Sequence, residues 1–253
     1  MKLNEFYALL EERIPKQYAC AWDNDGLMCA ADMNAEVRRV LCTLDVTEDA
    51  LRYAAANGFD TVLSHHPLIF RPLGALTPAY HIARKAAFAL QNGISVLSYH
   101  TRFDTMPGGM NDLLAATLGV KDAAPFGDGE SDTGRVGNLP QKTDIYEFCG
   151  QIKTALGSNA LLLAKAGNTV RRVAVLGGDG KDFIRGAIDA GADTLVSGRL
   201  GYNCMAEAAE MGISLIEAGH FFTENIICGF YLRLLAELGI EGEAYNSNKI
   251  ELL

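Results

Sequence analysis

The sequence lacks several features that would assign it quickly to a class. Its six cysteines are widely scattered and form no C-x-x-C pair, which argues against a cysteine-based zinc site and favours reduced, mostly buried thiols. No apolar run approaches the roughly 18 residues that a membrane span requires. Lys and Arg number 22 against 31 Asp and Glu, and this acidic balance argues against general nucleic-acid binding, which needs a basic face.

Signals of targeting and of common catalytic classes are also missing. Residues 1–16 mix acidic and basic positions on an amphipathic stretch, unlike a signal peptide, so we expect a cytoplasmic protein. The chain carries no G-x-S-x-G nucleophile elbow, no Walker loop and no cysteine beside a histidine. With 253 residues, 49% of them hydrophobic, it is long enough for two lobes with sizeable cores.

The most informative pattern is an internal repeat. Residues 37–66 align with residues 170–199 without a gap, at an offset of 133, and 11 of the 30 positions are identical. Each copy predicts a strand, a helix and a strand. The predicted segments are 37–44, 48–57 and 61–64 in the first copy, and 170–176, 181–190 and 194–197 in the second.

A weaker echo extends both copies. Residues 93–97 resemble residues 212–216 at an offset of 119, and predicted helices precede them at 79–92 and 202–211. Short apolar strands that alternate with helices are typical of parallel sheets. We therefore predict an α/β protein with two similar α/β lobes from an internal duplication, with mostly parallel sheets flanked by helices.

The lobes have predicted boundaries. We expect the first lobe at 1–120, the second at 121–219, and a closing helix with a C-terminal segment at 220–253 that packs back at a metal cleft between the lobes. Residues 121–137, rich in Gly, Asp and Ser, predict a linker or surface loop. Residues 222–238 predict one long closing helix that ends near Gly239.

Two of the five histidines close a predicted strand. His65 and His66 precede Pro67, which favours extended backbone at His66. Neighbouring side chains on extended backbone point in different directions, so the two imidazoles suit two metal ions better than one. The alternative is a pair of strand-end histidines that bond to the backbone.

Acidic and histidine side chains follow two further strands. Asp104 can bridge two cations through its oxygens, or it can cap a turn. For His100, four residues earlier, we favour a role in supporting a ligand or facing the substrate over a role as a metal ligand. His220 and Glu224 are four residues apart, so they share a face if a helix starts there. Alternatively, Glu224 simply favours a helix N-terminus.

These positions converge, because carboxyl ends of parallel strands meet at one edge of a sheet. Five residues then form the predicted metal set: His65, His66, Asp104, His220 and Glu224. Nitrogen and oxygen ligands of this kind fit Zn, Fe or Mn better than Mg or Ca. We predict two divalent ions about 3.5–4 Å apart that activate a shared water. His81, inside a predicted helix, should be dispensable for metal binding.

Two other motifs have more than one interpretation. Gly177-Gly178-Asp179-Gly180 can approach a phosphate or form a tight turn, and the spacing favours the turn. Trp22, the only tryptophan, can stack on a ring in a pocket or close the core.

Taken together, these motifs resemble the Nif-three-like dinuclear-metal proteins, often called GTP cyclohydrolase 1 type 2. The resemblance spans nearly the whole chain and is carried by the segments 22–26, 64–69, 100–104, 177–180 and 219–224. It implies a two-lobed α/β protein with a two-metal site between lobes, in a homo-oligomer that is often a toroidal hexamer. By the same resemblance the five residues above are the metal ligands, with Asp104 and Glu224 as bridges and His100 beside the metals.

The resemblance also shapes the expected function. It implies a dinuclear-metal-dependent hydrolase in which a metal-bridging hydroxide attacks a small-molecule substrate such as a nucleotide, with His100 as proton shuttle. Arg102 and Arg199 depart from the family pattern; they can add positive charge for a phosphate or carboxylate, or form surface ion pairs. The alternatives are a phosphoesterase and a non-catalytic metal-binding scaffold or regulator, which closed metal coordination would favour.

Overall fold

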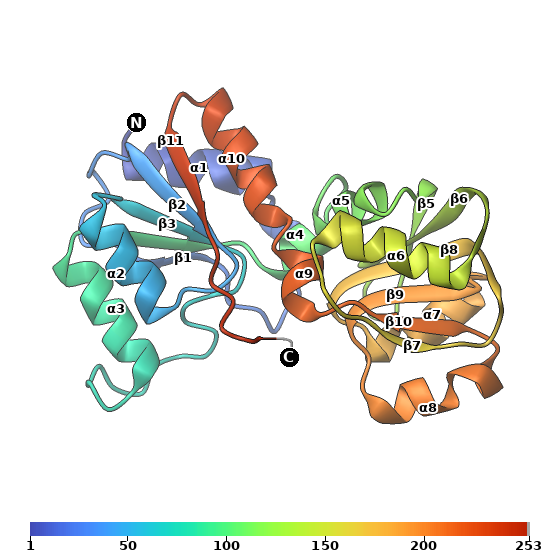
Figure 1. The fold of residues 1–253 in the computed structure, drawn as a ribbon. Helices are drawn as coiled ribbons and strands as arrows, with labels where there is room; N and C mark the ends of the chain where they lie inside the picture. The colour runs from blue at the N-terminus through green and yellow to red at the C-terminus, as the bar shows by residue number, and fades with distance from the viewer. Residues whose placement is uncertain (252–253) are drawn as a thin grey trace. The chain divides into compact units, whose positions relative to one another are not determined.

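The computed structural model describes residues 1–251, which form two compact units. The first unit contains residues 1–103 and 227–251, and the second contains residues 104–226. The boundaries predicted from the sequence lie at 120 and 219. Helix α4 (Thr101–Thr105) passes from the first unit into the second. Each unit is an α/β layer structure of its own (Figure 1).

The first unit is built on a five-stranded sheet of order β1-β4-β3-β2-β11. Three of its four strand pairings are parallel, and only β1 runs antiparallel to its neighbour. Its elements are α1 (Leu3–Arg13), η1 (Lys16–Tyr18), β1 (Gly26–Cys29), β2 (Arg39–Thr43), α2 (Glu48–Ala56), β3 (Thr61–Ser64), α3 (His81–Gln91), β4 (Ser95–Ser98), α10 (Ile227–Glu237) and β11 (Glu241–Tyr245).

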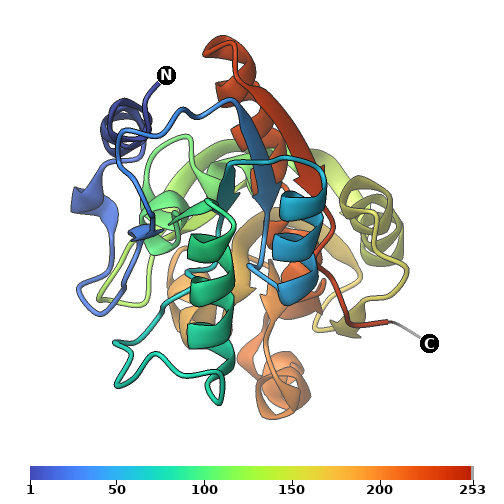
Figure 2. The same ribbon diagram turned by 90° about the vertical axis from the view of Figure 1, so that its left-hand side faces the viewer.

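Alternate side chains along these strands point to one face of the first sheet, and helices cover that face. Leu41, Val62 and Val96 occupy matching positions on three strands, and all pack into one cluster with Leu51 of α2 and Ala86 of α3. Figures 1 and 2 show α2 and α3 side by side over this face, with α10 on the opposite face. The Thr47 side chain caps α2, because its Oγ1 accepts a hydrogen bond from Ala50 N at 3.0 Å.

The second unit is built on a six-stranded mixed sheet of order β5-β6-β8-β9-β10-β7. The central β8-β9-β10 pairings are parallel, and the strands at both edges are antiparallel. Its elements are α5 (Met110–Thr117), β5 (Lys121–Phe126), β6 (Gly134–Asp144), α6 (Ile145–Leu156), β7 (Leu162–Ala164), β8 (Thr169–Asp179), η2 (Lys181–Phe183), α7 (Ile184–Asp189), β9 (Thr194–Arg199), α8 (Tyr202–Met211), β10 (Ser214–Glu217) and α9 (His220–Glu224).

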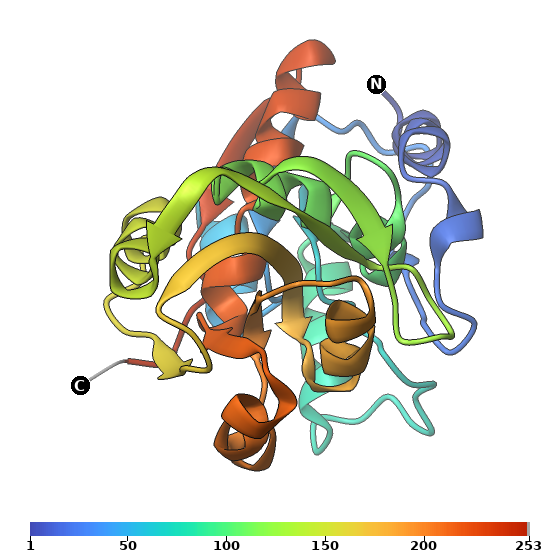
Figure 3. The same ribbon diagram turned by 90° about the vertical axis from the view of Figure 1, so that its right-hand side faces the viewer.

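Both faces of the second sheet are covered. Val173 and Val175 pack in a cluster with residues of α5 and α6, whereas Ala174 between them packs in another with α7 and α8. Val196 and Leu195 divide between the two clusters in the same way. Figure 3 shows this sheet with α6 and α7 on either side of it. The prediction of an α/β protein with two sheets flanked by helices is thus confirmed. Mostly parallel pairing holds for the first sheet, whereas three of the five pairings in the second sheet are antiparallel.

The two units repeat one strand register. Val40 pairs with Thr61 in the first unit, and Val173 pairs with Thr194 in the second, which is the offset of 133 found in the sequence. The loop before the second strand of each repeat also makes the same hydrogen bonds in both units. Asp60 Oδ2 accepts from two successive backbone amides at 2.9 and 3.1 Å, and Asp193 Oδ2 accepts from the two equivalent amides at 2.9 Å. A duplicated unit would produce this agreement, and the duplication itself stays a prediction.

Two local predictions are wrong. Residues 121–137 are not a linker, because most of them form the antiparallel β5–β6 hairpin of the second sheet. The closing helix is not continuous, because α9 ends at Glu224 and α10 begins at Ile227. This break falls where the chain leaves the second unit for the first. Within the described residues, no helix has both the length and the apolar character of a membrane span.

Candidate metal centre

Three histidines come together in the first unit at the carboxyl ends of neighbouring strands. His65 and His66 follow β3, and His100 follows β4. One ring nitrogen of each lies within 4.8 Å of the others, and the ring centroids are 5.1–5.6 Å apart. His65 is fully buried, and the other two are partly exposed. Parallel pairing of β3 with β4 brings these side chains together, because it aligns the two strand ends.

The first two imidazoles are held in one orientation. Nδ1 of His65 lies 2.9 Å from the Tyr99 carbonyl oxygen, which can only accept, so Nδ1 carries the proton. Nδ1 of His66 lies 2.7 Å from a carboxylate oxygen of Asp45 and donates in the same way. Nε2 is then the nitrogen with a lone pair on both rings. Metal-binding histidines are typically fixed through their other nitrogen in this manner.

His100 follows the same rule through Asp23. Its Nδ1 donates to Asp23 Oδ1 at 2.9 Å, while Oδ2 accepts from Thr101 N at 3.0 Å and Thr101 Oγ1 at 2.6 Å. Burial alone would raise the pKa of Asp23, but the hydrogen bond and charge of His100 and the bonds from Thr101 lower it to about 2. Asp23 therefore stays ionised at neutral pH and fixes both the tautomer and the position of His100.

Arg102 has a structural role rather than the substrate-facing or surface role expected from the sequence. The side chain is fully buried, and its guanidinium binds Asp25 through two hydrogen bonds of 2.7 and 2.8 Å. It also donates to Glu11 at 3.0 Å and to the Ile14 carbonyl at 2.9 Å. Asp23 and Asp25 thus hold three consecutive residues, 100–102, from one short turn. This turn positions the start of α4, which leads directly into Asp104.

The second unit contributes a group of carboxylates with one histidine. A carboxylate oxygen of Asp104, near the end of α4, lies within 4.8 Å of one of Glu224. On α9, His220 Nε2 lies 2.8 Å from Glu224 Oε2, so the four-residue spacing places both on one helix face, as predicted. Glu224 is almost fully buried, whereas the His220 side chain is 44% exposed. Two carboxylates this close favour a cation between them.

The glycine-rich segment lies mostly in the end of β8, so the predicted tight turn is wrong, and it packs against α9. Gly178 has a φ of +67°, and a Cβ there would lie 2.3 Å from Glu224 Oε1. Its amide donates to Thr223 Oγ1 at 3.2 Å. The neighbouring Gly177 amide donates to Asn111 Oδ1 at 2.8 Å, and Asn111 Nδ2 donates to the Asp104 carbonyl at 3.1 Å. The end of β8 therefore contacts both candidate carboxylate ligands of the second unit, Glu224 directly and Asp104 through Asn111.

Gly198 and Arg199 stand at the positions that His65 and His66 occupy in the first copy. A Cβ on Gly198 would lie 2.8 Å from His220 Cα and 2.7 Å from Thr223 Oγ1. The backbone of α9 thus fills the space that a side chain at 198 would need. The Arg199 side chain is exposed, and its carbonyl accepts from Gly180 N at 2.9 Å.

Aromatic side chains lie beside the three histidines. Trp22 is 64% exposed, which excludes a role in closing the core. Its ring centroid is 6.3 Å from that of His100 and 6.0 Å from that of Phe70, with edge-on geometry in both pairs. His81 lies apart from these groups, exposed at the start of α3.

Sequence reasoning missed the residues that orient the histidines. Asp45 and Asp23 make hydrogen bonds to His66 and His100. Asp45 had a usable signal, because it follows a strand, β2, at the same carboxyl edge as the histidines. Asp23 lies in the segment 22–26 that carries the resemblance, but its bond to His100 crosses 77 positions and has no local signal.

The donor chemistry of both units fits divalent transition metals. The first unit supplies three imidazoles, each with its Nδ1 hydrogen-bonded to an oxygen. The second unit supplies two carboxylates and one imidazole. Imidazole suits Zn, Fe and related ions, and carboxylates bridge or balance their charge. The fold and these residues define an α/β protein with histidine and carboxylate groups suited to metal binding.

Comparison with known proteins gives the family. The chain belongs to the Duf34/NIF3 (NGG1p interacting factor 3) family, whose model matches residues 1–248. The chain is 34% identical to a Clostridium perfringens protein named GTP cyclohydrolase 1 type 2 homolog, over 88% of this chain and 87% of that protein. A Lactococcus lactis protein of the same name is 31% identical, with 94% and 91% covered.

A solved structure supports the fold. A Bacillus cereus protein described as related to NIF3 superposes with a TM-score of 0.90 at 22% identity, covering 100% of this chain and 99% of that one. The resemblance stated from the sequence motifs is therefore confirmed.

Proposed function

We propose that this protein is a metal-dependent hydrolase that uses two divalent transition-metal ions, Zn, Fe or Mn. The proposed ligands are His65 and His66 from the first unit and Asp104, His220 and Glu224 from the second. The observation that carries the proposal is the orientation of the imidazoles in the first unit. Each has Nδ1 committed to an acceptor, which is the arrangement found around metal-binding histidines.

Bound ions of this class would supply Lewis acidity and lower the pKa of water enough to provide a nucleophile near neutral pH. The residues of the chain would supply orientation and proton transfer. We assign His100 the role of proton shuttle, because Asp23 accepts from its Nδ1 and orients the ring. A partly exposed imidazole can exchange a proton with water, whereas the buried His65 is suited to a fixed ligand.

The substrate class is proposed from the relatives. Several are named GTP cyclohydrolase 1 type 2 homolog, so a nucleotide is the first substrate to test. We further propose a homo-oligomer, such as a toroidal hexamer, acting in the cytoplasm. Within residues 1–251 none of the six cysteines forms a disulfide, which suits a reducing compartment.

The test combines metal analysis with a hydrolysis screen. The purified protein is loaded with Zn, Mn or Fe(II), its metal content is measured, and GTP and other nucleotides are screened for ring opening and phosphate release. The Asp104→Ala variant is the control. We expect about two ions per chain in the wild type, fewer in the variant, and hydrolysis that depends on the metal.

Each alternative corresponds to a distinct result. Release of phosphate without ring opening would favour a phosphoesterase. Full metal loading without any hydrolysis would favour a metal-binding scaffold or regulator. Unchanged metal content in the Asp104→Ala protein would contradict the ligand assignment itself.

A further inference from the structure

Trp22 and Phe70 form an exposed aromatic pair beside His100 in the first unit. Their ring centroids are 6.0 Å apart, and they lie 6.3 Å and 6.1 Å from the centroid of the His100 ring. The planes of the three rings meet at 71–83°, so they form the walls of a corner, which we call the aromatic corner. A flat ring that lies parallel to one wall stands edge-to-face with the other two, a geometry that aromatic rings favour.

Hydrogen bonds hold the aromatic corner in place. Asn24 Nδ2 donates to the Ile69 carbonyl, which joins the segment after Trp22 to the segment before Phe70. Asp23, directly after Trp22, accepts from His100 Nδ1 at 2.9 Å. The backbone segments that carry the three rings are therefore bonded to one another. A ligand would meet preorganised walls, which lowers the entropic cost of binding.

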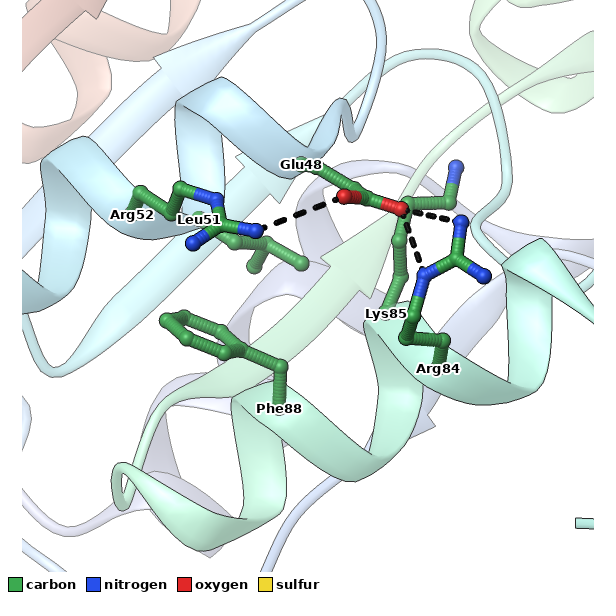
Figure 4. Close-up of a pocket in the computed structure, with 6 residues that line it drawn as sticks. All are labelled: Glu48, Leu51, Arg52, Arg84, Lys85 and Phe88. Atoms are coloured by element: carbon green, nitrogen blue, oxygen red, sulfur yellow. Dashed lines mark hydrogen bonds and ion pairs between the residues drawn. The ribbon is translucent and has the colours of Figure 1, made fainter. Parts of the chain in front are cut away.

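The groove between α2 and α3 shows how the chain covers a surface ring with its own side chains. Glu48 pairs there with Arg84 and Arg52, and the Arg52 guanidinium lies 5.9 Å from the centroid of the Phe88 ring (Figure 4). The remaining cavity measures only about 30 Å³. Trp22, by contrast, is 64% exposed. A large ring that is held in place and yet left in water is typical of a surface that a ligand covers.

The three walls of the aromatic corner are not equally open. The Arg71 guanidinium lies over the Phe70 ring, 5.8 Å from its centroid, and Phe70 is less exposed than Trp22. His100 is partly exposed. The indole of Trp22 is therefore the open stacking surface, and Phe70 and His100 are side walls.

We propose that the aromatic corner binds the planar nucleobase of the substrate, which stacks on Trp22 and meets Phe70 and His100 edge to face. This inference rests on the proposed hydrolase function, because it places the ring of that substrate beside the proton shuttle His100. Stacking on an exposed aromatic ring is favourable for every planar base. The corner therefore selects substrates by the presence of a ring, whatever phosphate groups they carry.

The test uses Trp22, the only tryptophan, as its reporter. The Zn-loaded protein is titrated with GMP, and the indole is excited at the long-wavelength edge of its absorption, where nucleotides absorb little. We expect saturable quenching with a Kd on the order of 0.1 mM, within the affinity that a ligand of this size can reach. Ribose 5-phosphate, which has the sugar and the phosphate but no ring, should neither quench nor compete. Absence of quenching by GMP, or equal competition by ribose 5-phosphate, would overturn the proposal.

Two variants each remove one wall of the aromatic corner. Phe70→Leu keeps an apolar side chain and should weaken GMP binding about three- to tenfold, because an edge-to-face contact is lost. Trp22→Leu, measured by equilibrium dialysis, should weaken it at least about fivefold, because the stacking surface is lost. Tyr146→Leu is the matched control, since it removes a ring that is 63% exposed on α6 of the second unit, and it should leave binding unchanged. Undiminished GMP binding in both corner variants, with wild-type circular dichroism, would refute the site.

Binding and hydrolysis can fail separately in these experiments. Saturable GMP quenching that needs the ring, without hydrolysis of any nucleotide, would support the aromatic corner and contradict the proposed hydrolase function. Metal-dependent nucleotide hydrolysis with an unchanged KM in both corner variants would support the hydrolase and overturn the aromatic corner.

Discussion

The packing of α9 against the second sheet leads to a quantitative prediction for Gly198→Ala. An added Cβ would lie 2.7 Å from the Gly178 carbonyl oxygen and 2.8 Å from His220 Cα. Both contacts are backbone atoms, which a rotamer change cannot move aside. The substitution therefore has to shift α9 or the end of β8. Both carry or support the candidate ligand Glu224.

The size of the effect follows from two opposing contributions. Overpacking a close contact typically costs about 1–3 kcal/mol. Replacing glycine by alanine gives back about 0.5–1 kcal/mol, because the unfolded chain loses freedom. The net destabilisation should be about 1–2 kcal/mol, which lowers the Tm by roughly 2–8 °C for a domain of this size. Displacing the ligand-bearing helix should also weaken Zn binding about tenfold or more.

Thermal unfolding by circular dichroism and Zn titration with a competing chelator measure the two effects. Gly150→Ala is the matched control, since Gly150 lies in α6 and its added Cβ meets nothing within 4 Å. That variant should gain about 0.5–1 kcal/mol and bind Zn normally. If Gly198→Ala unfolds at the wild-type temperature and binds Zn with wild-type affinity, the close packing of α9 inferred here is wrong.

Three further predictions concern the first unit. His65→Ala should lose at least one metal ion by elemental analysis while remaining folded, whereas His81→Ala should keep full occupancy; a large loss in His81→Ala would overturn the choice of ligands. Asp23→Ala should weaken metal binding or hydrolysis about 10–100-fold, because it removes the acceptor that orients His100; an unaffected variant would show that this hydrogen bond is dispensable. Trp22, the only tryptophan, should report Co(II) binding by fluorescence quenching while Zn leaves it bright, and a signal indifferent to Co(II) would contradict metal binding beside it.

The repeated βαβ units were predictable because their signals are local. Strand β3 has the predicted bounds Thr61–Ser64, and helix α8 the predicted bounds Tyr202–Met211. A short buried strand, a threonine cap and a glycine after the helix each act within a few residues. Asp60 and Asp193 are equally local, because each lies directly before a strand. Their hydrogen bonds to the start of the neighbouring strand help to fix the parallel register.

Elements outside the repeat gave weaker signals. Strand β5 has five exposed residues out of six, and β11 has no buried one, so neither shows the apolar alternation of a half-buried strand. Both lie at sheet edges, where hydrogen bonding to a neighbour stabilises the strand without a buried side-chain face. The break between α9 and α10 was missed because the apolar pattern continues through it, although the chain changes units there.

The candidate ligands were easier to predict than the residues that support them. A histidine at a strand end carries its chemistry in its own identity and position. The burial of Arg102 has no such local signal. It depends on Asp25 and Glu11, which are 77 and 91 positions away in the sequence. From the sequence, Arg102 could add charge near a substrate or form a surface ion pair, whereas the structure shows a fully buried guanidinium that binds two carboxylates.

The asymmetry of the repeat has a steric explanation. In the first unit the position after the strand bears His65, whose ring is buried and bonded to the Tyr99 carbonyl. In the second unit the equivalent Gly198 leaves room for the backbone of α9, which carries His220 and Glu224. A histidine at 198 and the present helix α9 would occupy the same space. The candidate ligands on α9 are therefore compatible with the packing of the second unit because residue 198 is a glycine, so packing accounts for the difference between the two candidate sets.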